Sequence, residues 1–217
     1  MFGMQGSLLD DIDEIGLRPL EPTRTPLADG AWVDVCPGWL TGVGDVFAHL
    51  SQAVEWRAER RWMYEREVDT PRLLRFYAEG EALPHPVLEH ARDALSRHYT
   101  RELGEPFTTA GMCLYRDGND SVAWHGDTLG RSSTHDTMVA IVSLGAPRPL
   151  LLRPASERAK REHQRSGHGG SLRFHVGHGD LVVMGGSCQR TWQHAVPKLT
   201  GSVGPRISVQ FRPHDVR

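Results

Sequence analysis

Two copies of the tripeptide His-Gly-Asp stand out as candidate metal ligands. One is His125–Asp127 in AWHGDTLG, and the other is His178–Asp180 in VGHGDLVV. A His-x-Asp pair joined by a distant second histidine provides the two imidazoles and one carboxylate that hold iron at non-haem centres. In a chain with 12 histidines and 27 acidic residues, however, one or two such triplets are expected by chance. The choice between them depends on the residues that accompany each.

The first triplet has the better-placed partner. His194 follows Asp127 by 67 residues, and the interval contains four predicted strands, enough to pass around a barrel and return beside the triplet. From the second triplet, His194 is only 14 residues away, across what reads as one hairpin. Gly177 and Gly179 also mark a turn there, in which an aspartate typically hydrogen-bonds to the backbone. We therefore predict a metal site formed by His125, Asp127 and His194.

Two arginines near the C-terminus point to an anion beside this metal. Arg206 and Arg212 lie six residues apart in RISVQFR, and the even spacing places both on one face of a strand. Guanidinium groups that point into a barrel are costly unless an anion meets them, and a dicarboxylate such as 2-oxoglutarate offers one at each end. An edge strand with two solvated arginines is the alternative, and the spacing alone leaves it open.

The strands that would position these residues follow from short β-rich runs separated by turn residues. Such a series begins after about residue 105 and is typical of a β-barrel or sandwich. The predicted strands are FTTAGMCLY, SVAWH, TMVAIVSLG, PLLLRP, SLRFHV, DLVVMGG, TWQHAVP and RISVQFR. Residues 155–170 are polar, basic and rich in small side chains, so we expect a long surface loop there.

The first half of the chain predicts two helices and one short strand. AWVDVCPGWL alternates like a strand, and DVFAHLSQAVEW has one apolar helical face with Asp45 as the expected N-cap. PHPVLEHARDALSRHY gives the clearest helix, because Pro84 and Pro86 stand at its start and five apolar residues form a stripe. Those five are Val87, Leu88, Ala91, Leu95 and Tyr99.

Composition is that of an ordinary globular domain with 39% hydrophobic residues and a formal net charge of −2. This charge makes no case of its own for a polyanionic partner. The acidic start without an apolar core does not resemble a signal peptide, and no apolar run is long enough for a membrane helix. We expect a cytoplasmic protein without a membrane partner, present as a monomer. Cys36, Cys113 and Cys188 are far apart and are expected to be free thiols.

In their order and spacing, these residues resemble the AlkB-like 2-oxoglutarate- and Fe(II)-dependent dioxygenases. The resemblance covers roughly residues 107–212, about half the chain. The matching segments are Tyr115 in CLYRDG, the first HGD, VSLGAP at 142–147, GHGDLVVMGG at 177–186, His194 and RISVQFR. It aligns the second HGD with a turn outside the metal site.

The resemblance implies a mainly β protein with N-terminal helices (α+β) and a double-stranded β-helix, or jelly-roll, core. Residues 1–30 are rich in Pro, Gly and Asp without a sustained period, so we expect a loosely ordered N-terminal arm there. Residues 31–105 would form a helical and nucleotide-lid portion. Residues 106–217 would form the catalytic core, and the three parts would act as one functional domain.

The resemblance also implies a role for each matching residue. His125, Asp127 and His194 would bind Fe(II), while Arg206 and Tyr115 would hold the distal carboxylate of the cosubstrate 2-oxoglutarate. Arg212 would meet the carboxylate next to the keto group. With O2, the reaction would decarboxylate 2-oxoglutarate to succinate and CO2, hydroxylate an N-linked methyl group and release formaldehyde.

Three positions depart from the family pattern. Cys113 and Ser208 stand where the family usually has asparagines that help to hold 2-oxoglutarate, so Ser208 remains a cosubstrate-binding candidate beside the charged anchors. Leu129 replaces the acidic residue that usually lies near the exocyclic amine of a damaged base, and Arg131 follows it. Leu129 and Arg131 are accordingly candidates for substrate contact, and the specific base is left open.

The segment WRAERRWMYEREVDTPRLLRFYAEG interleaves aromatic residues and arginines before the barrel. PRLLRFY resembles the substrate lid of the family, which would place Tyr77, with Trp62 or Tyr64, near a flipped base. Arg72 and Arg75 would reach phosphates, as would the basic loop at 155–170. A surface helix and strand with core aromatics and solvated charges is the alternative.

The resemblance implies oxidative demethylation of alkylated nucleic-acid bases in DNA repair, with DNA, or else RNA, as the partner. One alternative is an AlkB-like oxygenase that acts on RNA, protein or a small molecule, which Leu129 and the modest net charge leave open. A second is a cupin-like metal-binding module without oxygenase activity, against which the arginine pair argues.

Overall fold

The computed structural model describes residues 14–63, 66–128, 130–167 and 169–216, and for residues 60–63 and 66–69 it gives the backbone only. The strands are β1 (Gly16–Leu17), β2 (Thr23–Pro26), β3 (Ala31–Cys36), β4 (Leu40–Thr41), β5 (Arg57–Met63), β6 (Arg66–Tyr77), β7 (Thr109–Tyr115), β8 (Val122–His125), β9 (Val139–Gly145), β10 (Arg148–Pro154), β11 (Leu172–Val176), β12 (Leu181–Gly186), β13 (Trp192–Val196) and β14 (Arg206–Arg212). The helices are α1 (Val43–Ala53), α2 (Pro86–Leu103), α3 (Glu157–Arg165) and α4 (Cys188–Thr191), with short 3-10 turns η1 (Ala28–Gly30) and η2 (Arg131–Ser133).

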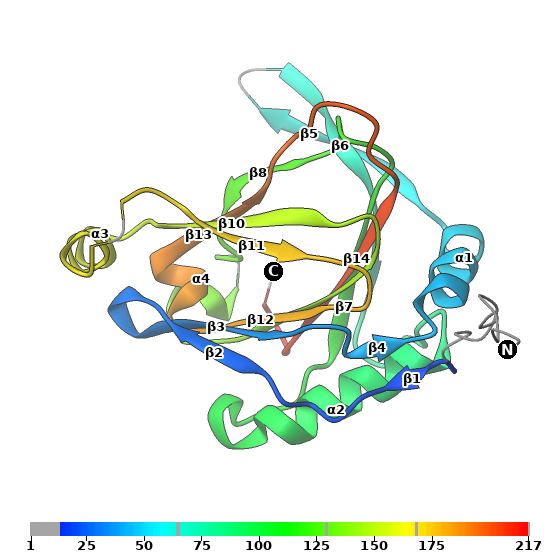
Figure 1. Cartoon of the computed structure of the whole chain (residues 1–217), viewed down its shortest axis with the longest axis horizontal. Coiled ribbons are helices and arrows are strands. Elements are labelled where there is room, and N and C mark those ends of the chain that lie inside the picture. The colour runs from blue at the N-terminus through cyan, green and yellow to red at the C-terminus, as the bar shows by residue number, and fades with distance from the viewer. Residues whose placement is uncertain (1–13, 64–65, 129, 168, 217) are drawn as a thin grey trace, which may run out of the picture.

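Two sheets form the body of the protein. The larger has eight strands in the order β2-β3-β12-β9-β14-β7-β6-β5, and the smaller has four in the order β11-β10-β13-β8. Figure 1 shows α1 and α2 outside the sheets. All eight strands predicted after residue 105 are present, and the chain passes through β9, β10, β11 and β12 between β8 and β13. Since β8 and β13 pair directly, the long interval does return beside the first triplet.

Alternation along the strands separates two hydrophobic cores. The inner core lies between the sheets and joins residues such as Val139 and Val182 to Leu152 and Trp192 of the smaller sheet. The outer core lies between the eight-stranded sheet and the helices. On β14, Ile207, Val209 and Phe211 belong to this outer core, so the residues between them face the interior.

The helix α2 forms as predicted and covers the outer core. The five predicted stripe residues are all buried, and the backbone N–H of Val87 donates to Nδ1 of His85, the N-cap residue. For α1 the expected cap is wrong, because Gly42 in a left-handed conformation precedes the helix and Asp45 lies in its first turn. None of the helices in the described ranges is long and apolar enough to cross a membrane.

Residues before 105 contribute more of the sheet than the sequence indicates. Within the expected loose arm, residues 14–30 include β1, which pairs with β4, and β2, which pairs with β3. The expected helical portion at 31–105 also supplies β3, paired with β12, and the β5–β6 hairpin, paired with β7. The loose arm is therefore a wrong prediction for 14–30, because long-range pairing orders this segment.

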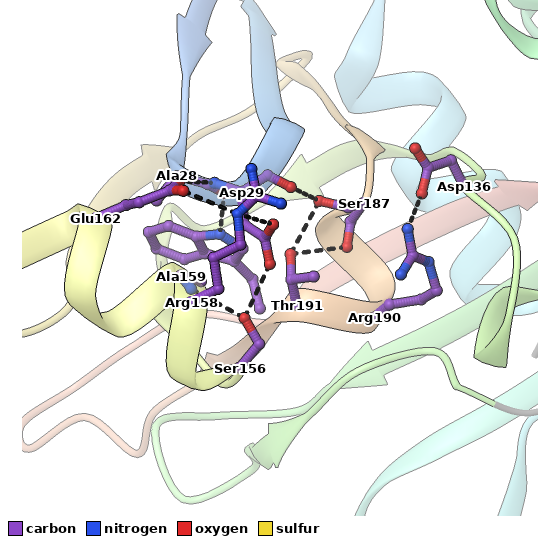
Figure 2. A network of polar contacts seen from close by, with 11 residues as sticks. Ala28, Asp29, Asp136, Ser156, Arg158, Ala159, Glu162, Ser187, Arg190 and Thr191 are labelled. Carbon is purple, nitrogen blue, oxygen red and sulfur yellow. Dashed lines mark hydrogen bonds and ion pairs between the residues drawn. The ribbon is translucent and has the colours of Figure 1, made fainter.

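The expected loop at 155–170 is also wrong, because it contains α3. Ser156 caps this helix by accepting from the N–H of Ala159. A network of polar contacts joins α3 to η1 and α4 (Figure 2). In it, Asp29 accepts from the hydroxyl of Ser156 and pairs with Arg158, while Ser187 donates to the Asp29 carbonyl.

Candidate functional site

The three predicted metal ligands meet at the junction of β8 and β13. His125 ends β8 and lies opposite His194 of β13 in the antiparallel register, with the two ring centroids 4.2 Å apart. Asp127 follows β8, and its carboxylate oxygen Oδ1 lies 3.9 Å from Nε2 of His125. One potential ligand atom from each residue lies within 4.8 Å of the others. Two imidazoles and one carboxylate at this spacing fit the donor set that Fe(II) accepts.

Backbone and side-chain contacts fix the orientation of these ligands. The Nδ1–H of His125 donates to the carbonyl of Ala123 at 2.8 Å, which leaves Nε2 for a metal. The backbone N–H of Asp127 donates to Oε1 of Gln189 at 3.2 Å. Between the two ligands, a Cβ on Gly126 would lie 2.6 Å from the carbonyl oxygen of Gln189. The triplet therefore needs its glycine, because α4 packs directly against it.

The electrostatic environment keeps the ligands in their metal-binding protonation states. Burial raises the pKa of the Asp127 carboxyl, but Arg212 and the two histidines outweigh burial and lower it to about 2. Burial and the neighbouring His125 lower the pKa of His194 to about 3, and burial also lowers the pKa of His125. At neutral pH the site therefore holds one carboxylate and two neutral imidazoles, as metal binding requires.

A buried arginine lies ready for a carboxylate in the interior. Arg206 is 3% exposed, and its Nη2 donates to Oγ of Ser143 at 2.7 Å. Its Nε and Nη1 atoms are buried without a hydrogen-bond partner among the described residues. Its guanidinium carbon lies 5.2 Å from the ring centroid of Tyr115. The Nε–H and Nη1–H donors of this buried guanidinium can meet a carboxylate, such as one end of 2-oxoglutarate.

The second arginine contacts the metal-ligating carboxylate. Arg212 donates from Nε and Nη2 to Oδ2 of Asp127, at 2.9 and 2.8 Å. The sequence predicts a contact with the cosubstrate, and the structure adds this ion pair, which holds Asp127 in place. Oδ1 remains on the side of His125. Arg212 therefore links the strand of Arg206 to the metal ligands.

The second His-Gly-Asp triplet is a turn, as predicted. Asp180 accepts from the backbone N–H of Gly177 at 2.7 Å and from that of Gly38 at 2.8 Å. Gly179 has a φ of 89°, which favours glycine. The His178 ring accepts at Nδ1 from the N–H of Gly145. Both side chains are occupied by backbone groups, away from the metal ligands.

The predicted substrate residues are placed differently. Tyr77 is a wrong prediction, because it is 6% exposed within the outer core, beneath the helices. Phe76 lies opposite Gly111 of β7, on the interior face, and is 43% exposed. Facing residues in neighbouring strands point the same way, so the aromatic side chain of β6 on the interior face is Phe76 and not the adjacent Tyr77. The side chain of Trp62 and all of Tyr64 and Leu129 lie outside the described residues.

The arginines expected to contact substrate already have protein partners. Arg72 donates to the carbonyl of Ser121, Arg75 pairs with Glu81, and Arg131 pairs with Glu105. On α3, the predicted basic loop, Arg158 and Lys160 pair with acidic neighbours. These contacts favour the alternative of balanced surface charge over phosphate binding for these side chains.

Several residues that support the site by contacting its side chains or backbone belong to no recognisable motif and were missed from the sequence. Gln189 holds the backbone of Asp127, Ser143 holds Arg206, and Arg148 is buried with three backbone carbonyls as acceptors. Only the strand alternation of TMVAIVSLG gave a signal, because it places Ser143 among apolar residues. Gln189 and Arg148 have no comparable signal.

Comparisons with known proteins agree with this geometry. The 2OG-Fe(II) oxygenase superfamily matches residues 46–212. The alpha-ketoglutarate-dependent dioxygenase alkB homolog 3 of Bos taurus is 30% identical over 94% of this chain and 70% of its own length. The DNA oxidative demethylase ALKBH2 of Homo sapiens is 30% identical over 58% of this chain and 46% of its own length. The solved structure of OsALKBH1 superimposes on 87% of this chain and all of its own with a TM-score of 0.56 at 13% identity, which shows a shared fold.

The superfamily uses Fe(II), 2-oxoglutarate and O2, and the two histidines and one aspartate described above provide a site of the expected kind. A metal module without oxygenase activity is therefore excluded. Sequence match, fold and ligand set together show that the chain belongs to the AlkB-like dioxygenases of the 2OG-Fe(II) oxygenase superfamily.

Proposed function

We propose that this enzyme demethylates alkylated nucleic-acid bases, with DNA as its substrate. The reaction couples removal of an N-linked methyl group as formaldehyde to conversion of 2-oxoglutarate into succinate and CO2. The similarity to a protein named a DNA oxidative demethylase supports the substrate class. We likewise infer that the two sheets form a double-stranded β-helix, which the likeness to OsALKBH1 supports.

The protein's part in this chemistry is to bind, orient and exclude water. His125, Asp127 and His194 would hold Fe(II), which supplies oxygen activation and the oxidising step when bound. Arg206 would hold the distal carboxylate of 2-oxoglutarate in the buried interior, beside the Tyr115 ring. Arg212 keeps Asp127 ionised and correctly placed. The apolar residues of the inner core keep water away from the reacting groups.

The observation that carries the choice of substrate is the placement of Phe76. An aromatic residue on the interior face that is 43% exposed is suited to stack against a base taken out of a nucleic-acid strand. Its cross-strand neighbour Gly111 lies next to Arg212, since a Cβ on Gly111 would be 2.9 Å from Nη1 of Arg212. Arg212 in turn contacts Asp127. The ring therefore belongs to the same end of the barrel as the metal ligands.

A direct assay tests the proposal. The protein is incubated with Fe(II), 2-oxoglutarate, ascorbate and oligonucleotides that carry N1-methyladenine or N3-methylcytosine, and succinate, formaldehyde and the repaired base are measured. Unmethylated oligonucleotides and RNA versions of each sequence serve as controls. Repair of DNA with stoichiometric formaldehyde is expected. Succinate without repair of any base would refute the nucleic-acid substrate and leave the dioxygenase.

A substitution tests the stacking role. Phe76→Ala should raise KM for the methylated oligonucleotide by roughly 5- to 160-fold, because base–aromatic stacking contributes about 1–3 kcal/mol. Succinate formation without nucleic acid should not change. Ile15→Ala removes another exposed apolar side chain, which lies before β1, and should leave KM as in the wild type. Equal KM values for all three proteins would remove Phe76 from the substrate site.

A further inference from the structure

Four polar residues of β14 face the interior in a row. Arg206, Ser208, Gln210 and Arg212 alternate with the outer-core residues of the same strand. Ser208 is 2% exposed and Gln210 is 9% exposed. Ser208 therefore lies between the two arginines, on the buried face that would receive 2-oxoglutarate. It is also one of the two positions where the family pattern usually has an asparagine, Cys113 being the other.

The side-chain amide of Gln210 turns back onto Ser208. Its Nε2 donates to the backbone carbonyl of Ser208 at 3.1 Å and also to the Ser208 hydroxyl oxygen. Its Oε1 accepts from the thiol of Cys113 at 3.8 Å. A carbonyl oxygen can only accept, so the group that faces it must be the NH2 of the amide. Because Nε2 of Gln210 is a donor, the Ser208 hydroxyl oxygen must be the acceptor in its contact with Nε2.

This contact leaves the Ser208 hydroxyl hydrogen to be donated elsewhere. A serine hydroxyl has one hydrogen and two acceptor lone pairs, and Gln210 occupies a lone pair. Among the residues that the structure describes, none accepts the hydrogen of Ser208. A buried donor without an acceptor is costly, so a bound acceptor would complete the arrangement.

The surroundings of Ser208 point to an anionic oxygen as that acceptor. Its cross-strand partners are Cys113 on β7 and Ser143 on β9, which are small side chains. Ser143 already accepts from Arg206, whose Nε and Nη1 remain unpaired among the described residues. The Ser208 hydroxyl and the Nε–H and Nη1–H groups of Arg206 are thus unfilled donors among the described residues, on one buried face and two residues apart on a strand. Both suit the carboxylate of a bound dicarboxylate.

We propose that Gln210 is a positioning residue that directs the Ser208 hydroxyl hydrogen toward bound 2-oxoglutarate. Gln210 and Ser208 together provide the neutral hydrogen bond that asparagine side chains provide in the family pattern. Cys113 steadies the far end of the amide. The proposal rests on the cosubstrate, which family membership gives, and it does not depend on the nucleic-acid substrate.

Binding of 2-oxoglutarate to the Mn(II)-loaded protein, followed by titration calorimetry, tests it without turnover. Ser208→Ala should raise Kd roughly tenfold, because it removes a hydrogen bond to a charged group. Gln210→Leu, which keeps the size and loses the amide, should raise Kd by about three- to tenfold. The double variant should bind no more weakly than Ser208→Ala alone, because both changes remove one interaction. In turnover, KM for 2-oxoglutarate should rise while kcat stays within about twofold.

A rescue separates positioning from a general structural role. Ser208→Asn brings its own amide, so adding Gln210→Leu to it should leave Kd unchanged. Gln164→Leu, on the exposed side of α3, is the matched control and should bind as the wild type does. If Gln210→Leu does not fold, Gln210→Met is used, and Ser208→Ala still reports on the donor. Additive effects of the two substitutions, or an unchanged Kd in Ser208→Ala, would overturn the proposal whether or not any base is repaired.

Discussion

At the scale of single residues, the two aspartates of the His-Gly-Asp triplets differ in what surrounds them. Asp127 is 5% exposed, beside two histidines and an arginine, so its charge is held for a cation. Asp180 accepts two backbone N–H groups across a turn, and its hydrogen-bonding capacity serves the fold. Identical tripeptides therefore have different chemistry because different strands lie next to them.

Substitution of each aspartate separates these roles. Asp127→Ala and His194→Ala should abolish metal-dependent turnover, because each removes one of three ligands. Asp180→Ala should keep iron binding and kcat but lower the free energy of unfolding by about 1–3 kcal/mol, because two backbone donors lose their acceptor. Iron content and urea unfolding measure the two effects. Iron lost from Asp180→Ala but kept by Asp127→Ala would mean that the wrong triplet is assigned.

The turn histidine gives the protein a pH dependence of its own. His178 accepts from the N–H of Gly145 at Nδ1 and must be unprotonated to do so. Partial burial lowers the pKa of His178 below its ordinary value of 6.5, against the opposing effect of Asp180. Below about pH 6.5 the unfolded chain therefore binds a proton that the folded protein resists, and stability is lost as the pH falls.

His178→Asn keeps an acceptor for Gly145 but does not titrate. The free energy of unfolding of this variant, measured without metal from pH 8 downward, should fall less steeply below about pH 6.5 than that of the wild type. At pH 8 the two proteins should be equally stable within about 1 kcal/mol. The same slope in both proteins would show that His178 contributes nothing to the acid sensitivity.

At the scale of elements, the metal histidine of β13 depends on what precedes it. α4 leads directly into β13 and is tied to η1, as Figure 2 shows. Ser187 is 4% exposed, donates to the carbonyl of Asp29 and contacts the hydroxyl of Thr191. Nε1 of Trp192, next along the chain, donates to the carbonyl of Ala28 at 3.0 Å. An N-terminal segment thus supports the strand that carries His194.

Loss of one contact in this network should therefore lower the free energy of unfolding. Ser187→Ala should lower the free energy of unfolding by about 1–3 kcal/mol, because the partly buried carbonyl of Asp29 loses a donor. Asp136→Ala is the matched control, since it removes a more exposed pair with Arg190 of the same helix. It should lower stability by less than about 1 kcal/mol. Urea unfolding compares them, and equal losses would contradict a supporting role for Ser187.

The elements that could be predicted are those whose own side chains carry a pattern. Strands from 107 onward alternate and end at turn residues, and α2 has its apolar stripe. α3 has only Ala159 and His163 buried, which is too little periodicity to distinguish a helix from a loop. β2 is entirely exposed and exists because β3 pairs with it. Such pairings are set by distant residues and leave no local signal.

For the site, side-chain chemistry and spacing predicted the ligands, whereas the substrate side depended on register. The meeting of His125, Asp127 and His194 could be predicted because the strands between them can be counted from the sequence. Tyr77 and Phe76 are adjacent in sequence but lie on opposite faces of β6, and a shift of one residue exchanges those faces. Only the pairing of Phe76 with Gly111 decides which ring faces the interior.

At the scale of the whole molecule, the interior combines an apolar core with two buried arginines that serve different purposes. Arg148, 1% exposed, donates to the carbonyls of Asp117, Asp120 and Pro197 and so joins loops at one end of the barrel. Arg206, 3% exposed, donates to Ser143, its Nε and Nη1 have no partner among the described residues, and burial lowers its pKa. A buried charge with too few partners costs stability, and the carboxylate of 2-oxoglutarate proposed above would supply the missing partner.

Replacing each arginine by methionine should therefore have opposite consequences. Arg148→Met should destabilise the protein without cosubstrate by more than about 2 kcal/mol, because three carbonyls lose a charged donor. Arg206→Met should leave that stability unchanged or higher, since methionine fills the space without a buried charge. In the wild type, Mn(II) with 2-oxoglutarate at 100 times its Kd should add about 2.7 kcal/mol, and Arg206→Met should lose the increment due to 2-oxoglutarate. Chemical unfolding with and without 2-oxoglutarate measures all four quantities. An Arg206→Met protein that is strongly destabilised but still gains stability from 2-oxoglutarate would show that this arginine belongs to the fold and not to the cosubstrate.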